Sequence, residues 1–171
     1  MIFKKLILGF LINHLNFSFA ADFIVTVDEK KTVIDEKSIA ANLKLQTVEI
    51  NIPNESQPGK PSRGKFKAYE GKKFLDFVFG KNFNWQKSKT LTFACSDGFK
   101  PEFSTKDFLK DDFLFAIERF DNKKFEMINH AKDHKPVYLG PYYLIWTSES
   151  KFLAENIRFW PYQLVEIQAG K

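Results

Sequence analysis

The residue best suited to chemistry is the single cysteine, Cys95, in the stretch TLTFACSDGF (90–99). It ends an apolar run that predicts a strand, and the Asp-Gly pair that begins two residues later predicts a turn. A thiolate at the end of a strand, shortly before a helix that Ser104 could cap, would lie near backbone N–H groups, which favour negative charge. Such a corner could bind a metal or an anionic cofactor. Alternatively, Cys95 is a small core hydrophobe, as most free cysteines are.

The histidines offer a second, weaker pattern. His130 and His134 are four residues apart in NHAKDHKP, with Asp133 between them, and on a helix this spacing would place both rings on one face as metal ligands. Pro136 and the polar composition instead favour a solvated loop. Either histidine could also serve as the base for a Cys95 nucleophile, although such pairing is spatial. The sequence contains no Gly-rich phosphate loop, G-x-S-x-G, H-E-x-x-H or C-x-x-C motif.

The N-terminus has the pattern of a secretory signal peptide. Two lysines precede an apolar stretch at 6–12, and small residues occupy the −3 and −1 positions of a cleavage site after Ala20. A retained membrane anchor is the alternative, but a spanning helix needs about 20 apolar residues, and polar residues interrupt this stretch. We therefore expect residues 1–20 to be a signal peptide, no membrane span after cleavage, and a periplasmic or secreted protein.

Composition narrows the class of the mature chain. We expect residues 21–171 to form a single domain, because no repeat or linker divides them and their number suffices for a core. A lone cysteine excludes an internal disulfide. The formal net charge is +5, but Pro and Gly interrupt the densest basic run, KPSRGKFK (60–67), so no nucleic-acid partner is expected. The 20 phenylalanines predict a large aromatic core.

Periodicity and punctuation predict many strands with short helices between some of them. In 162–168 the alternation places Leu164, Glu166 and Gln168 on one face, and alternation likewise turns Tyr143 away from Tyr142. The mixed order favours an α+β fold built on a mixed β-sheet or open barrel with short helices. Strands are expected at 22–27, 46–53, 89–95, 124–129, 142–146 and 162–168, and at 113–120 a buried strand is preferred to a helix. Helices are expected at 38–44, within 67–80 and from Ser104, and a loop at 54–64.

Three segments carry a resemblance to a known family: TLTFACSDGFKPEFSTKDFL, then DHKPVYLGPYYLIW, then RFWPYQLVEIQ. They are similar to small exported relatives of the sulfite oxidase-type molybdopterin-binding domain. The resemblance covers residues from about 40 to the C-terminus and implies the α+β fold of that domain. It implies that the Cys95 thiolate ligates the molybdenum of a molybdopterin cofactor and that a Gly-Pro segment shapes the pocket rim. The implied cofactor-binding residues are Cys95, Ser96, Asp97, Gly98, Gly140 and Pro141.

Three functions follow. The first is an exported redox-associated protein that holds molybdenum through Cys95 and passes electrons to a c-type cytochrome or another periplasmic carrier. The second is a cofactor-free exported module that binds a partner or small molecule, with Cys95 as an inert core thiol. Asp97, which adds negative charge beside an anionic cofactor, and the few arginines favour this second function. The third is an unrelated α+β domain with an aromatic ligand pocket. Basic groups around Cys95 would support the first, and phenylalanines over the thiol would support the second.

Overall fold

The computed structural model describes residues 21–52, 62–121, 125–128, 136–147 and 160–170. Within these ranges the chain forms eleven strands, three short α-helices and one turn of 3-10 helix. In chain order they are β1 (Phe23–Val27), β2 (Lys30–Ile34), α1 (Glu36–Asn42), β3 (Leu45–Ile52), β4 (Ser62–Glu70), α2 (Gly71–Phe79), η1 (Trp85–Lys87), β5 (Thr90–Cys95), β6 (Glu102–Ser104), α3 (Thr105–Phe108), β7 (Phe113–Arg119), β8 (Glu126–Ile128), β9 (Pro136–Tyr138), β10 (Tyr143–Trp146) and β11 (Leu164–Gly170).

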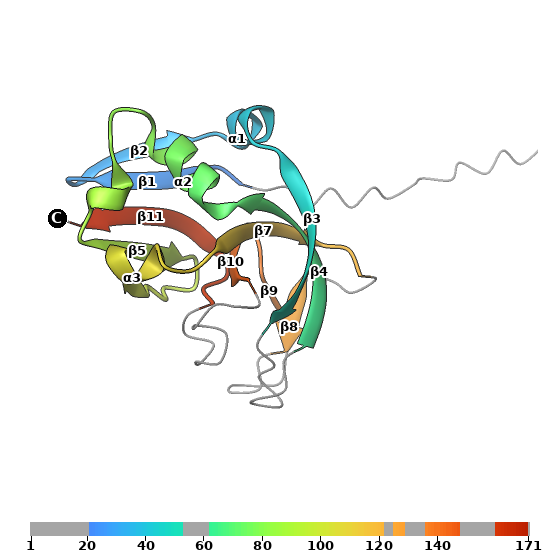
Figure 1. Cartoon of the computed structure of the whole chain (residues 1–171). Helices are drawn as coiled ribbons and strands as arrows, with labels where there is room; N and C mark the ends of the chain where they lie inside the picture. The colour runs from blue at the N-terminus through green and yellow to red at the C-terminus, as the bar shows by residue number, and fades with distance from the viewer. Residues whose placement is uncertain (1–20, 53–61, 122–124, 129–135, 148–159, 171) are drawn as a thin grey trace, which may run out of the picture.

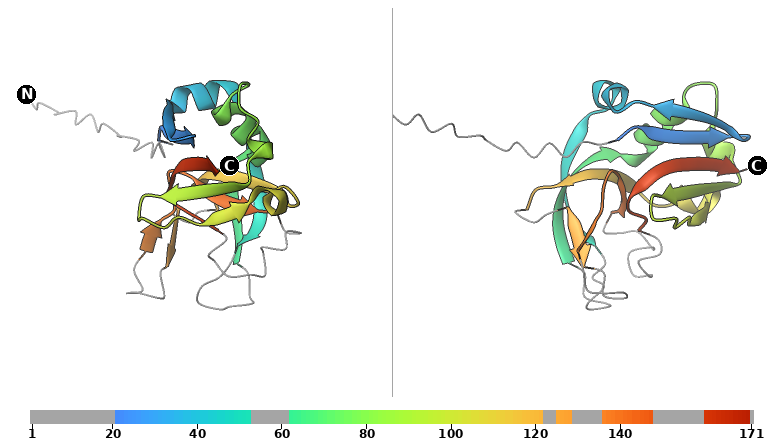
Figure 2. Two further views of the ribbon diagram at one scale, coloured as in Figure 1. Left: turned by 90° about the vertical axis from the view of Figure 1, so that its left-hand side faces the viewer. Right: turned by 180° about the vertical axis from the view of Figure 1, so that it is seen from behind.

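The described strands form two larger sheets and one hairpin. The five-stranded sheet has the order β2-β1-β11-β5-β6, the four-stranded sheet β10-β7-β4-β3, and β8 pairs with β9. The β1–β11 pair is parallel and the other pairs are antiparallel, so the first sheet is mixed. In Figures 1 and 2, α1 and α2 lie at one end of the molecule and the β8–β9 hairpin at the other. The predicted α+β class with a mixed sheet is confirmed, and the described strands form no closed barrel.

The main core lies between the two larger sheets and is aromatic, as the phenylalanine content predicts. Phe93 of β5 lies 6.5 Å from Phe115 of β7, ring centre to ring centre, and Phe103 of β6 lies 6.0 Å from Trp146 of β10. Phe74 of α2 closes one end of this core, 4.3 Å from Phe115. Aromatic rings bury large apolar areas and gain further from edge-to-face and tilted contacts, so this cluster ties the sheets together.

A second, smaller core covers the other face of the four-stranded sheet. Tyr142 packs against the main core, whereas the next residue, Tyr143, contacts Phe66 at 6.3 Å and Trp160 at 6.3 Å. This confirms the predicted alternation. Phe125, just before the β8–β9 hairpin, lies 6.4 Å from Phe66 and extends this second core. The four-stranded sheet is thus buried on both faces near its centre.

Helix α2 forms where the periodicity predicts it. Leu75 and Val78 join Phe74 and Phe79 on its buried side, and Glu70 caps its start by accepting the N–H groups of residues 72 and 73. Gly80 ends the helix with φ +72°, a conformation that favours glycine.

Several predicted boundaries are wrong. Residues 62–70 form strand β4 rather than the end of a loop and the approach to a helix, and β2 was not predicted at all. Helix α1 begins at Glu36, and its cap is Asp35, whose carboxylate accepts the N–H of Ser38, instead of Ser38 itself. Parts of the predicted loop at 54–64 and strand at 124–129 lie outside the described residues.

Strand β11 also corrects the predicted alternation. A bulge between Leu164 and Glu166 shifts the register, so that Leu164 and Ile167 both reach the core. Glu166 then lies on the other face of the sheet. Its carboxylate accepts hydrogen bonds from Thr26 and Gln168 and pairs with Lys31 at 3.2 Å.

Candidate functional site

The predicted Asp-Gly turn lies directly after β5 and is closed by backbone hydrogen bonds. The Cys95 N–H donates to the carbonyl of Phe99 at 2.9 Å, and the Gly98 N–H donates to the Cys95 carbonyl at 3.1 Å. Asp97 accepts the Phe99 N–H through its carboxylate at 3.0 Å. Gly98 has φ +90°, which explains the glycine at this position. The turn predicted from the sequence is therefore confirmed.

The structure brings this turn close to the second predicted segment. Leu164, the first residue of β11, pairs with Cys95 on one side and with Tyr142 on the other. The Ser96 N–H donates to the Gln163 carbonyl at 2.9 Å. The side chain of Gln163 donates in turn to the carbonyl of Tyr138 at 2.8 Å. We call this arrangement of residues 95–99, 138–142 and 163–164 the Cys95 corner.

Gly140 and Pro141 occupy a tightly packed part of the Cys95 corner. The peptide bond between them is cis. A Cβ atom on Gly140 would lie 2.5 Å from the hydroxyl oxygen of Tyr138, so glycine lets the Tyr138 ring lie against the backbone. The side chain of Tyr138 is half exposed and its ring contacts Phe125 at 5.8 Å. Gly140 thus has a packing role that requires no ligand.

The thiol of Cys95 is poorly placed to bind a metal. Its residue is 5% exposed and belongs to the hydrophobic core. Burial raises the pKa of the thiol to about 12, and the negative charge of Asp97 adds to this shift. A metal ligand must be the thiolate, which this environment disfavours. The charge that acts on Cys95 among the described residues is the negative one of Asp97, and this does not fit an anionic molybdenum cofactor.

Three basic side chains were candidates to lie around Cys95: Arg119, Arg158 and His130. Arg119 donates to the carboxylate of Asp121 at 2.7 Å and lies over the ring of Phe66, 5.6 Å from its centre. It therefore belongs to the second core. Arg158 and His130 lie outside the described residues.

The histidine pattern also lies outside the described residues, since His130, Asp133 and His134 all fall between β8 and β9. Metal binding there, or a role as base for Cys95, stays a prediction. Within the described ranges, no group of three or more His, Cys, Asp or Glu side chains could hold a metal ion.

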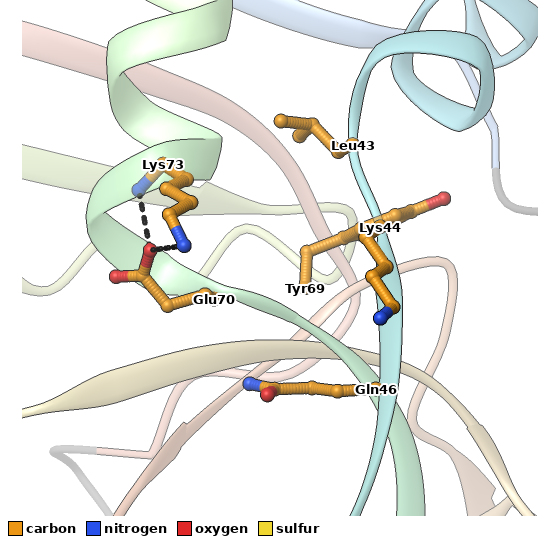
Figure 3. A pocket seen from close by; sticks show the side chains of 6 residues that line it. All are labelled: Leu43, Lys44, Gln46, Tyr69, Glu70 and Lys73. Carbon is orange, nitrogen blue, oxygen red and sulfur yellow. Dashed lines mark hydrogen bonds and ion pairs between the residues drawn. The ribbon is translucent and has the colours of Figure 1, made fainter.

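A pocket that the sequence did not indicate lies where β3 and β4 diverge toward the two helices (Figure 3). Its volume is about 180 Å³. One wall comes from the α1–β3 junction and the other from the end of β4 and the start of α2. The lining residues are Leu43, Lys44, Gln46, Tyr69, Glu70 and Lys73. No motif marks these residues, because they approach one another only when β4 pairs with β3.

The first described residues are held by the fold. The hydroxyl of Tyr142 donates to the carbonyl of Ala21 at 3.0 Å, and the Asp22 carboxylate accepts the N–H of Glu36 at 3.1 Å. Burial raises the pKa of Tyr142. The residue that would begin the mature chain is therefore attached to the main core, while cleavage after Ala20 stays a prediction.

Comparison with known proteins does not assign the chain to a family. No model of a protein family matches the chain, and no curated protein matches it. No helix in the described part of the chain is long and apolar enough to cross a membrane.

Proposed function

We propose that this chain is an exported binding module without a resident cofactor, in which Cys95 is an inert core thiol. The observation that carries the proposal is the burial of Cys95 in an apolar core with a pKa raised to about 12. A thiol in this state is neither a good nucleophile nor a good metal ligand.

The residues that the resemblance assigns to a cofactor have structural roles that support this proposal. Gly98 permits a turn with positive φ, and Gly140 makes room for the Tyr138 ring. Ser96 joins the turn to Gln163 through its backbone N–H and its hydroxyl, which donates at 3.2 Å. In our proposal the chain keeps the fold of the sulfite oxidase-type molybdopterin-binding domain, and these motifs persist because they hold the Cys95 corner together.

The redox hypothesis makes a different, measurable claim. In that hypothesis Cys95 holds molybdenum and electrons pass to a c-type cytochrome or similar carrier. One observation favours it: Cys95 and Tyr142, the residue after Gly140–Pro141, pair with the same residue of β11, Leu164, on its two sides. Against it stands the raised pKa of the thiol.

Metal analysis of the protein from its native host separates the two hypotheses. The wild-type protein and the Cys95→Ser variant would be purified from that host, and molybdenum and pterin would be measured per chain. We expect neither in either protein, and near-equal yields of both. About one molybdenum per wild-type chain, lost in the variant, would overturn the proposal and establish Cys95 as a ligand.

A further inference from the structure

The pocket between β3 and β4 has one polar wall and one mixed wall. Lys73 and Glu70 lie on the α2 side, and the side chains of Leu43 and Gln46 extend from the opposite side toward them (Figure 3). The side chain of Tyr69, which is 2% exposed, extends from β4 across β3 (Figure 3), and its ring packs against Phe74. Such a mixture of an apolar surface with a few polar groups is typical of small-molecule sites.

The pocket is lined by two lysines and one glutamate, so its charged side chains carry a net positive charge. The Glu70 carboxylate already accepts two backbone N–H groups at the start of α2, at 3.0 and 3.3 Å, and it pairs with the Lys73 ammonium at 3.6 Å. Lys44 forms no ion pair with any residue that the structure describes. Lys73 and Glu70 neutralise each other, so Lys44 supplies the unpaired charge of the lining, which favours a negatively charged ligand.

The volume of the pocket and its apolar lining indicate how large the ligand is and that part of it is apolar. The volume is about 180 Å³, and engineered apolar cavities of about 150 Å³ hold benzene. Leu43 offers apolar surface, while the Gln46 amide can donate a hydrogen bond. A pocket of this size can hold a ligand that has one compact apolar group and one charged group.

We propose that this pocket binds a small monocarboxylate with a compact apolar body. Its carboxylate pairs with the Lys44 ammonium group, and its apolar body rests on Leu43. The inference rests on the proposed function, because it names the class of ligand that such a binding module takes. The molybdenum measurement does not depend on the pocket, so either proposal can fail without the other.

A titration followed by backbone amide NMR tests the ligand class. The protein, produced from the full-length sequence in an exporting host, would be titrated with benzoate, isovalerate, benzamide and benzylamine. We expect saturable shifts for at least one of the two carboxylates at the amides of Lys44, Gln46 and Tyr69. Binding should weaken as sodium chloride rises from about 20 to 500 mM, because salt screens exposed charges. Benzamide, which has the same shape without the charge, should bind at least twofold more weakly than benzoate.

Three single substitutions test the assigned charges. Lys44→Gln should weaken carboxylate binding about two- to fivefold, the range for a partly exposed ion pair. Lys100→Gln removes an equal charge from the exposed β5–β6 turn and should leave binding unchanged. Glu70→Gln removes the negative group and should tighten binding.

Four outcomes would overturn the proposal. The first is the absence of saturable shifts for both carboxylates, and the second is equal binding of benzoate and benzamide. The third is an equal loss of binding in Lys44→Gln and Lys100→Gln. The fourth is preferential binding of benzylamine that Glu70→Gln abolishes, since the pocket would then take cations.

Discussion

Replacing Ser96 by cysteine in a Cys95→Ser background moves the thiol of this protein by one residue, from the core to the surface. Cys95 is 5% exposed, whereas Ser96 is exposed in the turn that follows β5. Both proteins then have one thiol, the same turn and the same neighbouring carboxylate of Asp97. Their difference in reactivity therefore reports burial, with little contribution from sequence context.

The structure sets the expected size of this difference. Burial, with a further contribution from Asp97, raises the pKa of the Cys95 thiol from 9.0 to about 12. Because alkylating reagents attack the thiolate, the reactive fraction at pH 8 falls about a thousand-fold relative to an ordinary thiol. The reagent must also reach a sulfur that lies inside the core, which adds to the expected protection.

The assay is alkylation with iodoacetamide at pH 8, followed by mass spectrometry of the intact protein. We expect the Ser96→Cys thiol to react at the rate of a small free thiol and Cys95 to react at least about a thousand-fold more slowly. In denaturant both should react at similar rates. Folded Cys95 reacting within tenfold of the surface thiol would refute the inert-thiol argument, and so would a rate–pH profile with its midpoint near 9.

Three further substitutions test the energetics of the fold. Phe74→Ala opens a cavity at the fully buried end of the aromatic core that α2 closes, and urea denaturation should show a loss of about 3–5 kcal/mol in unfolding free energy; a loss below about 1 kcal/mol would contradict the packing described. Gly71→Ala places a methyl group against the ring and carbonyl oxygen of Phe113 and should cost about 1–3 kcal/mol by the same assay; unchanged stability would show that α2 can shift away. For Glu166, burial raises the pKa, but hydrogen bonds from Thr26 and other neighbours outweigh it and lower the pKa below 4.5. The charged carboxylate therefore stabilises the fold above about pH 4.5, and this stabilisation is lost as pH falls through the lowered value. Glu166→Gln should cost about 1–3 kcal/mol at pH 7 and less as the pH falls through the lowered pKa, and a cost independent of pH would refute this assignment.

The strands that could be predicted are those with a local signal. β5 is apolar with threonines and an aromatic ring, so its type follows from its own residues, whereas the apolar run of β7 favoured a strand and left a helix as the alternative. Helix α2 was also predictable, because Phe74 and Val78 repeat at helical spacing before Gly80. Burial then confirms the same residues as the main core.

The strands that were missed depend on partners elsewhere in the chain. β2 is exposed along most of its length and pairs only with β1 among the described strands, so its residues carry little apolar pattern. β4 contains lysines that alternate with Phe66 and Ala68, but a glycine and nearby loop residues hide this alternation. The pairing of β4 with β3 and β7 overrides these local signals.

The candidate site shows the same division between local and distant information. The Asp-Gly turn was predictable because two adjacent residues determine it. The residue that pairs with Cys95 in the sheet, Leu164, was not predictable, because it comes from the far end of the chain and enters the site through a bulged strand. A cysteine at the end of a strand is compatible with a ligand or with a core residue, and only the packing of distant segments distinguishes them.

In this protein the packing of distant segments encloses the Cys95 sulfur among apolar side chains, and the charge that affects it, that of Asp97, is negative. Glycines in the same motif serve the turn and the Tyr138 ring equally well with or without a ligand. Motif residues of this kind therefore carry information about the fold, and evidence of chemistry has to come from the charge and exposure of the reactive atom itself.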